Sequence, residues 1–218
     1  MNKLEKIATD YLNQNKQQFL NEYTNEIQAT DEKIAIFTAG MSGVGKTELG
    51  IFFKENNPDI LHIDTDNIRE FFKPVGYDGQ NSDVFQKVAS RGFNGLFNYT
   101  LKKGYSIILD SNLSNVNLAI QNIERLAKRG YNIHIYYLYN YPKVCFEYAT
   151  RREVVTHRKV PKEIFVKSNF NSYNTVLEIK SLFKESINLH FIDKRNDTFY
   201  QNIDDNFIKN KIGVDFEI

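Results

Sequence analysis

The sequence predicts an α/β fold in which a parallel sheet of five strands carries helices on both faces. Short apolar runs alternate with longer segments of helical periodicity, and glycine or proline marks the start or end of several of them. Parallel strands need a crossover connection, usually a helix, so this alternation favours a parallel sheet. In such a sheet, ligands bind beyond the carboxyl ends of the strands.

The expected strands are short apolar runs at residues 33–39, 60–63, 106–109, 132–139 and 187–193. Helices are expected at residues 46–54, 82–103, 115–129, 142–153 and 161–170. Residues 3–28 place apolar side chains at three- and four-residue steps, which predicts an amphipathic helix packed on the core. We therefore expect one domain over residues 1–218, with a helical extension at 1–32, a core at 33–193 and a tail at 194–218.

Composition and charge narrow the classes of protein. The chain has 218 residues, 41% of them hydrophobic, and a formal net charge of +1. A dedicated nucleic-acid binder usually carries a clear basic excess, so the bulk charge does not favour that class. The single cysteine, Cys145, excludes an internal disulfide and suits a reducing compartment. Because no apolar run has the length of a membrane-spanning helix and the first residues lack the apolar region of a signal peptide, we expect a cytoplasmic protein that does not bind membranes.

The segment after the first expected strand predicts a phosphate-binding loop. It reads Gly40-Met41-Ser42-Gly43-Val44-Gly45-Lys46-Thr47 and matches the pattern G-x-x-x-x-G-K-[ST] between a strand and a helix. The glycines let the backbone curl so that N–H groups point at phosphate oxygens, and the helix that follows offers its positive end to the same anion. We expect Lys46 to contact the β- and γ-phosphates of ATP and the Thr47 hydroxyl to bind Mg²⁺.

Other motifs narrow the class of nucleotide-binding protein. GTPases also carry D-x-x-G and N-K-x-D motifs, and the sequence contains neither. Motor and helicase ATPases usually carry Asp-Glu after an apolar strand, whereas Asp110 is followed here by Ser111. The combination favours a small kinase.

Two expected strands end in the carboxylates that a kinase acting on a hydroxyl would need. Asp64 and Asp66 follow the second strand, and alternate side chains of an extended segment point in opposite directions. One of the two is therefore expected to cap the next helix, while the other orients the acceptor hydroxyl and takes its proton. Asp110 ends the third strand near the phosphates, where it would hold Mg²⁺ or the acceptor.

Residues 151–161 read RREVVTHRKVP and form a locally basic segment before an expected helix. Phosphoryl transfer spreads negative charge over the equatorial oxygens, and a guanidinium group that closes over them stabilises that charge. A run of charges is also typical of a solvated surface, so both interpretations stay open at this point.

Together, four segments resemble the zeta-toxin family of P-loop kinases. They are GMSGVGKT at 40–47, HIDTDNIR at 62–69, ILDSNLSN at 108–115 and RREVVTHRKVPKE at 151–163, and the resemblance covers residues 33–183. It implies a P-loop NTPase fold that uses ATP and Mg²⁺. Characterised toxins of this family phosphorylate the 3′-hydroxyl of UDP-N-acetylglucosamine, and a small helical antitoxin typically neutralises them.

The resemblance also implies roles for single residues. Asp66 matches the general base of the family, and Arg69 matches an arginine that is common after it, which makes Arg69 a candidate substrate-binding residue. Arg152 and Arg158 match arginines that clamp phosphate on either side of a short lid. The implied catalytic set is therefore Lys46, Asp66, Arg152 and Arg158. Thr47 keeps its role as a Mg²⁺ ligand, and Asp110 is the second ligand expected from its place after the third strand.

The sequence departs from the family in the acceptor pocket. Where the toxins tend to carry Glu-Gly-Thr, this chain has Asp110-Ser111-Asn112, which makes Asp110 and Asn112 candidate substrate-binding residues. A His-Pro pair expected after the base is replaced by residues 72–77. ILDSNLSN and RKVP are also similar to polynucleotide 5′-hydroxyl kinases, so a nucleic-acid end is an alternative acceptor. A nucleotide-binding module without catalytic activity is the third interpretation.

Overall fold

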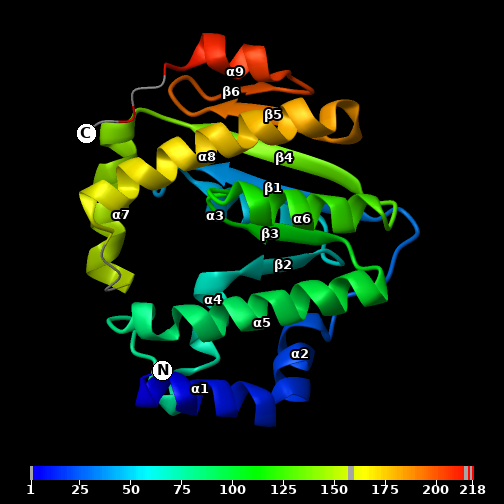
Figure 1. The fold of residues 1–218 in the computed structure, drawn as a ribbon, viewed down its shortest axis with the longest axis vertical. Coiled ribbons are helices and arrows are strands. Elements are labelled where there is room, and N and C mark those ends of the chain that lie inside the picture. The colour runs from blue at the N-terminus through cyan, green and yellow to red at the C-terminus, as the bar shows by residue number, and fades with distance from the viewer. Residues whose placement is uncertain (1, 157–159, 214–215, 217) are drawn as a thin grey trace.

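The structure is a computed structural model that describes residues 2–156, 160–213, 216 and 218. A six-stranded sheet runs through the middle of the molecule (Figure 1). Its spatial order is β2 (Leu61–Asp64), β3 (Ile107–Asp110), β1 (Ile34–Gly40), β4 (Asn132–Tyr139), β5 (Asn188–Asp193) and β6 (Thr198–Tyr200). The first five of these strands are parallel, and β6 is antiparallel to β5.

The predicted α/β fold is confirmed, but the sheet has six strands where five were predicted. The sixth, β6, has three residues and forms a hairpin with β5. Asp197, the residue before it, has φ 51, which is typical of a tight turn. Three residues are too few to show the two-residue alternation by which a strand is recognised, so the sequence pattern could not reveal it.

Alternating side chains bury both faces of the sheet. Along β1, Ala35 and Phe37 pack into the main core, whereas Ile36 faces the other side and packs near Phe53 of α3 (Lys46–Asn56). In Figure 1, α6 (Val116–Ala127) and α8 (Lys162–Phe183) cross the near face, which is the main-core face. Helices therefore cover both faces, as predicted.

The helix predicted at 3–28 is divided into α1 (Lys3–Gln14) and α2 (Lys16–Thr24). The break lies at Asn15, whose side-chain Nδ2 donates a hydrogen bond to the Tyr11 carbonyl at 2.9 Å. Such a side-chain bond competes with the helical backbone pattern, which ends one helix and lets the next start at a new angle. In Figure 1, the long helix α5 (Ser82–Lys103) lies between α1 and the edge of the sheet at β2.

The second half of the chain completes the layers with α7 (Pro142–Thr156), the 3₁₀ turn η2 (Lys184–Ser186) and α9 (Asp205–Lys211). The helix predicted at 161–170 extends to Phe183, because Asn169, Ser172 and Thr175 are buried against the core in place of ending the helix. Within the described residues, no helix is both long enough and apolar enough to cross a membrane.

The sheet register brings the predicted site residues to one edge. Asp64 and Asp110 are paired neighbours at the carboxyl ends of β2 and β3. Gly40 pairs with Leu138 near the carboxyl ends of β1 and β4. The edge of the sheet where ligands bind in parallel α/β folds therefore carries the phosphate loop and the carboxylates together.

Candidate active site

The predicted phosphate loop connects β1 to α3, and neighbouring elements enclose it tightly. Gly40 and Gly43 have φ values of 127 and 77, which glycine adopts without strain. A Cβ atom at Gly40 would lie 2.3 Å from the Leu138 carbonyl oxygen, and one at Gly43 would lie 2.3 Å from the Cys145 carbonyl oxygen of α7. The Gly40 N–H donates a hydrogen bond to Ser172 Oγ of α8 at 3.0 Å. Both α7 and α8 therefore fix the loop from outside.

Lys46 is the first residue of α3, and its side chain is buried. Its Nζ donates hydrogen bonds to the carbonyl oxygens of Gly40 and Met41 at 3.1 and 2.5 Å. Burial lowers the pKa of Lys46 to about 8, although the carboxylate of Asp110 opposes the shift, and the positive charge of Arg152 lowers it further. A poorly solvated cation of this kind is strongly stabilised when a negatively charged phosphate group comes close.

Asp110 is a buried carboxylate at the end of β3. Its Oδ1 accepts a hydrogen bond from Thr38 Oγ1 at 2.8 Å, and its Oδ2 lies 3.6 Å from His62 Nε2. Burial by itself would raise the pKa of Asp110, but the contacts with His62 and Thr38 and the charge of Lys46 outweigh it, so the pKa is lowered. Asp110 is therefore ionised at neutral pH. Sequence reasoning assigned no role to Thr38 or His62, and the only signal for Thr38 was a polar residue inside an apolar strand.

Asp110 and Thr47 suit a Mg²⁺ ion that arrives with a nucleotide. Asp110 Oδ2 is buried, and its contact with His62 Nε2 at 3.6 Å is too long for a hydrogen bond, so its lone pairs can face a cation. Thr47 lines the same cleft and offers a hydroxyl oxygen. Mg²⁺ prefers oxygen ligands and usually takes one or two from the protein and the rest from phosphate and water. The residues present therefore fit this ion.

The two aspartates after β2 take different places. Asp64 is the N-cap of α4 (Thr65–Glu70), and its Oδ1 accepts a hydrogen bond from the Asp66 N–H at 2.9 Å. This confirms the prediction that one of the two caps the next helix. Burial, with the nearby charge of Asp66, raises the pKa of Asp64 to about 6. Both aspartates line the cleft, and the Asp66 side chain is 42% exposed.

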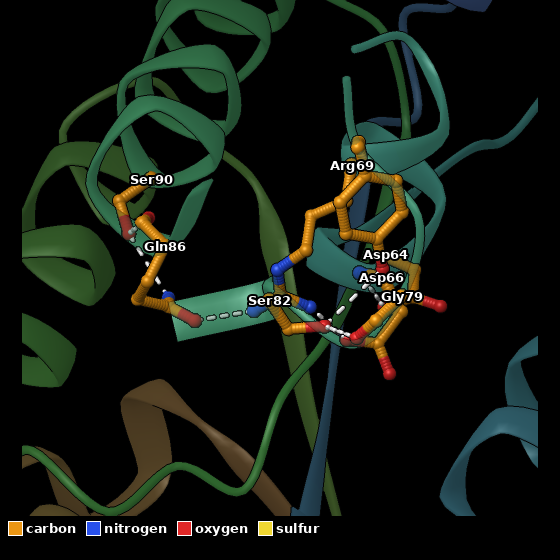
Figure 2. Close-up of polar contacts among 8 residues, drawn as sticks. Asp64, Asp66, Arg69, Gly79, Ser82, Gln86 and Ser90 are labelled. Carbon is orange, nitrogen blue, oxygen red and sulfur yellow. Dashed lines mark hydrogen bonds and ion pairs between the residues drawn. The ribbon is translucent and has the colours of Figure 1, made fainter. Parts of the chain in front are cut away.

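Arg69 connects α4 to α5 (Figure 2). Its guanidinium group forms an ion pair with Asp66 through Nη1 and donates from Nη2 to Gln86 Oε1 of α5. Gln86 Nε2 donates in turn to Ser90 Oγ at 3.3 Å. The Arg69 side chain is only 2% exposed, although it carries a full charge. Gln86 and Ser90 were missed by sequence reasoning because they lie inside a long helix where no motif marks them.

These groups share one cleft of about 1130 Å³ at the carboxyl edge of the sheet. The residues predicted for the site that line it are Ser42, Gly43, Val44, Gly45, Lys46, Thr47, Asp66, Arg69, Asp110, Asn112 and Arg152. Arg151 lines the cleft as well. Lys194 and Asp197 do so from the β5–β6 turn, in the segment predicted as a tail. Arg158 lies outside the described residues, so its predicted place opposite Arg152 stays a prediction.

Comparisons with known proteins give a family. The family model described as Zeta toxin matches residues 17–205, which is most of the chain. The search of curated protein sequences found no match to this chain. A chain in the structure of the PezAT chromosomal toxin–antitoxin system of the human pathogen Streptococcus pneumoniae is similar, with a TM-score of 0.70 and 16% identity over 92% of this chain and 82% of that chain.

Two structures of the AvrRxo1-ORF1:ORF2 complex have a similar fold. The structure with ATP gives a TM-score of 0.66 and 12% identity over 96% of this chain and 71% of that chain. The structure with sulphate ions gives a TM-score of 0.66 and 11% identity over 96% and 71%. At these identities the similarity concerns the fold, while the family match rests on the sequence itself. The chain belongs to the zeta toxin family of P-loop kinases.

Proposed function

We propose that this chain is an ATP-dependent kinase that transfers the γ-phosphate to a hydroxyl of a small-molecule acceptor, a nucleotide sugar such as UDP-N-acetylglucosamine. The observation that carries the proposal is that the phosphate loop and Asp66 line the same cleft of about 1130 Å³. This volume exceeds the roughly 300–1,000 Å³ of a typical site for one small molecule, so it suits two ligands side by side. Family membership supports a role as a toxin, and we propose a small helical antitoxin as its partner.

Each side chain has a separate task in this proposal. Lys46 and the backbone N–H groups of the loop bind the β- and γ-phosphates. Asp66 orients the acceptor hydroxyl and takes its proton, and Asn112 binds the acceptor. Held by Thr47 and Asp110, Mg²⁺ would supply positive charge to the phosphate oxygens. Arg152 would stabilise the negative charge that grows on the transferred group.

Arg152→Ala is expected to lower kcat about 10²-fold and to leave the affinity for ADP nearly unchanged. Arg152 lies on α7, lines the cleft and is close enough to Lys46 for its charge to lower the pKa of that lysine. An arginine that meets charge mainly in the transition state contributes to kcat more than to binding of the ground state. Steady-state kinetics and calorimetry of ADP binding measure the two effects separately.

Two controls accompany Arg152→Ala. Arg152→Lys should restore only part of kcat, because one ammonium group replaces a planar fork that contacts two oxygens. Arg129→Ala should leave both quantities unchanged, since Arg129 is an exposed residue just after α6. A wild-type kcat in Arg152→Ala would mean that the basic segment is a solvated surface.

One labelling experiment tests the proposed function. The protein is incubated with γ-labelled ATP and, in parallel, with UDP-N-acetylglucosamine, a bacterial metabolite extract and an RNA oligonucleotide that carries a 5′-hydroxyl. Label on the nucleotide sugar supports the proposal. Label on another metabolite corrects the acceptor, and label on the RNA end makes the chain a polynucleotide kinase. Binding of ATP without any labelled product would overturn the kinase proposal in favour of a nucleotide-binding module.

A further inference from the structure

One face of α5 lines the part of the cleft next to Asp66, where we propose that the acceptor binds. Gln86, Ser90 and Asn94 are spaced four residues apart, so they lie on the same side of the helix, and all three line the cleft. The 22-residue length of α5 makes it a rigid support beside the six-residue α4, which carries Asp66. Contacts from α5 to α4 therefore decide where the Asp66 carboxylate is held.

The direction of each hydrogen bond in this network follows from the chemistry of its groups (Figure 2). A guanidinium group only donates, so the Gln86 atom that faces Arg69 is the amide oxygen. The Ser90 hydroxyl donates to the main-chain carbonyl of Gln86 at 2.9 Å, which leaves the Ser90 oxygen to accept from Gln86 Nε2 at 3.3 Å. A flipped amide would point N–H groups at the guanidinium. Ser90 therefore fixes the orientation of Gln86.

The position of the Arg69 guanidinium depends on two contacts. A buried charge is tolerated only when its polar atoms have good partners. Nη1 contacts Asp66 and Nη2 contacts Gln86, whereas Nε has no hydrogen-bond partner among the described residues. Without the Gln86 oxygen, the guanidinium loses its contact with the rigid helix α5. Of the two contacts, the one with the partly exposed Asp66 would then remain.

We propose that Gln86 is a positioning residue for Asp66 and acts through Arg69. The Gln86 oxygen fixes the Arg69 guanidinium, and the guanidinium selects one rotamer of the Asp66 carboxylate. This inference rests on the proposed kinase function, in which Asp66 orients the acceptor hydroxyl. A displaced carboxylate loses the alignment on which efficient transfer depends, even though the nucleotide still binds.

Gln86→Met tests the proposal, because methionine keeps the length of the side chain and removes its acceptor oxygen. With UDP-N-acetylglucosamine as the probe acceptor, kcat should fall about tenfold while the KM for ATP stays unchanged. The melting temperature should fall, because a buried Arg69 donor loses its acceptor, so the kinetics are measured well below the transition of the variant. Gln86→Glu keeps an oxygen for Arg69 and should restore most of kcat. Gln121→Met, at an exposed position of α6, is the matched control and should behave as wild type. A raised KM for the acceptor with unchanged kcat would show that Gln86 binds the acceptor directly, which overturns the proposal.

A double-mutant cycle with Asp66→Asn isolates the path. If Gln86 acts through Asp66, Gln86→Met should have no further effect on kcat in the Asp66→Asn protein. A second tenfold loss there would contradict the inference and assign Gln86 a role of its own.

A spectroscopic readout separates failure of this inference from failure of the proposed function. The Arg69 guanidinium N–H groups, assigned by their loss in Arg69→Lys, should give resolved ¹⁵N signals in the wild-type protein because both Nη atoms are hydrogen-bonded. In Gln86→Met these signals should merge as the guanidinium rotates more freely. Unchanged signals would overturn the inference whether or not the protein phosphorylates the sugar, and an inactive wild type with the expected signals would overturn only the proposed function.

Discussion

Asp66→Asn is expected to lower kcat by roughly 10²–10⁴-fold, the usual loss when a general base is removed. Asparagine has the shape of aspartate, and its amide oxygen still accepts the hydrogen bond from Arg69 Nη1. It cannot take a proton from the acceptor hydroxyl. Single-turnover transfer to UDP-N-acetylglucosamine measures the loss, and calorimetry with ATP should show binding close to that of the wild type.

Asp64→Asn is the matched control for that variant. Asparagine is as good an N-cap as aspartate, so the hydrogen bond from the Asp66 N–H and the start of α4 should both persist. We expect kcat to stay within about threefold of the wild-type value, because the Asp64 side chain caps α4 and is not the proposed general base. A larger loss in Asp64→Asn than in Asp66→Asn would exchange the roles of the two carboxylates. Wild-type kinetics in both variants would place the acceptor elsewhere.

Lys46→Ala is expected to abolish measurable transfer and to weaken binding of ATP·Mg²⁺ by about 10–100-fold. The second figure corresponds to the loss of a hydrogen bond between charged groups, worth roughly 1.5–3 kcal/mol. The loss of transfer is larger, because the same charge also stabilises the phosphate oxygens in the transition state. Calorimetry and labelled-ATP transfer measure both. Lys128→Ala, at an exposed position after α6, should change neither. Unchanged affinity and turnover in Lys46→Ala would contradict the role of the phosphate loop.

Removing the Lys46 charge is expected to increase the stability of the free protein, although it abolishes transfer. The pKa of Lys46 is lowered from 10.5 to about 8, so the folded protein binds its proton less tightly than the unfolded chain does. The lysine charge therefore costs stability fully below about pH 8, and this cost disappears as the pH rises towards 10.5. Lys46→Met should raise the free energy of unfolding of the free protein at pH 7, by on the order of 3 kcal/mol at most, and its melting temperature with it. An inactive variant that is more stable cannot owe its inactivity to unfolding.

The sequence predicts the nucleotide side of the cleft better than the acceptor side, for a physical reason. The phosphate loop is contiguous, and its glycines are required by the backbone conformation that cradles an anion, so a short motif is sufficient to predict it. Asp110 could be predicted to lie near the loop because the carboxyl ends of parallel strands meet at one edge. That one of Asp64 and Asp66 caps the next helix follows in the same way from the alternation of side chains after a strand, whereas the choice between the two depended on the family resemblance.

The rest of the cleft depends on contacts that no local pattern encodes. Gln86 meets Arg69 across 17 residues, and only the packing of α5 against α4 brings the two together. The contribution of Lys194 and Asp197 depends on a hairpin whose second strand has three residues. In α8, buried polar residues continue a helix that intrinsic propensity would end. In each case tertiary packing overrides the local signal.

The hydrogen bond between the Gly40 N–H and Ser172 Oγ spans 132 residues, and this separation governs when the site is assembled during synthesis. The loop residues leave the ribosome early, but α7 and α8, which enclose the loop, are translated much later. The support of α4 can form earlier, since the Tyr23 hydroxyl of the short helix α2 donates a hydrogen bond to the Asn67 carbonyl, only 44 residues further along the chain. Such short helices are marginal until they dock. An incomplete nascent chain therefore lacks an assembled cleft, and a ribosome that releases its product before α8 yields a fragment without one.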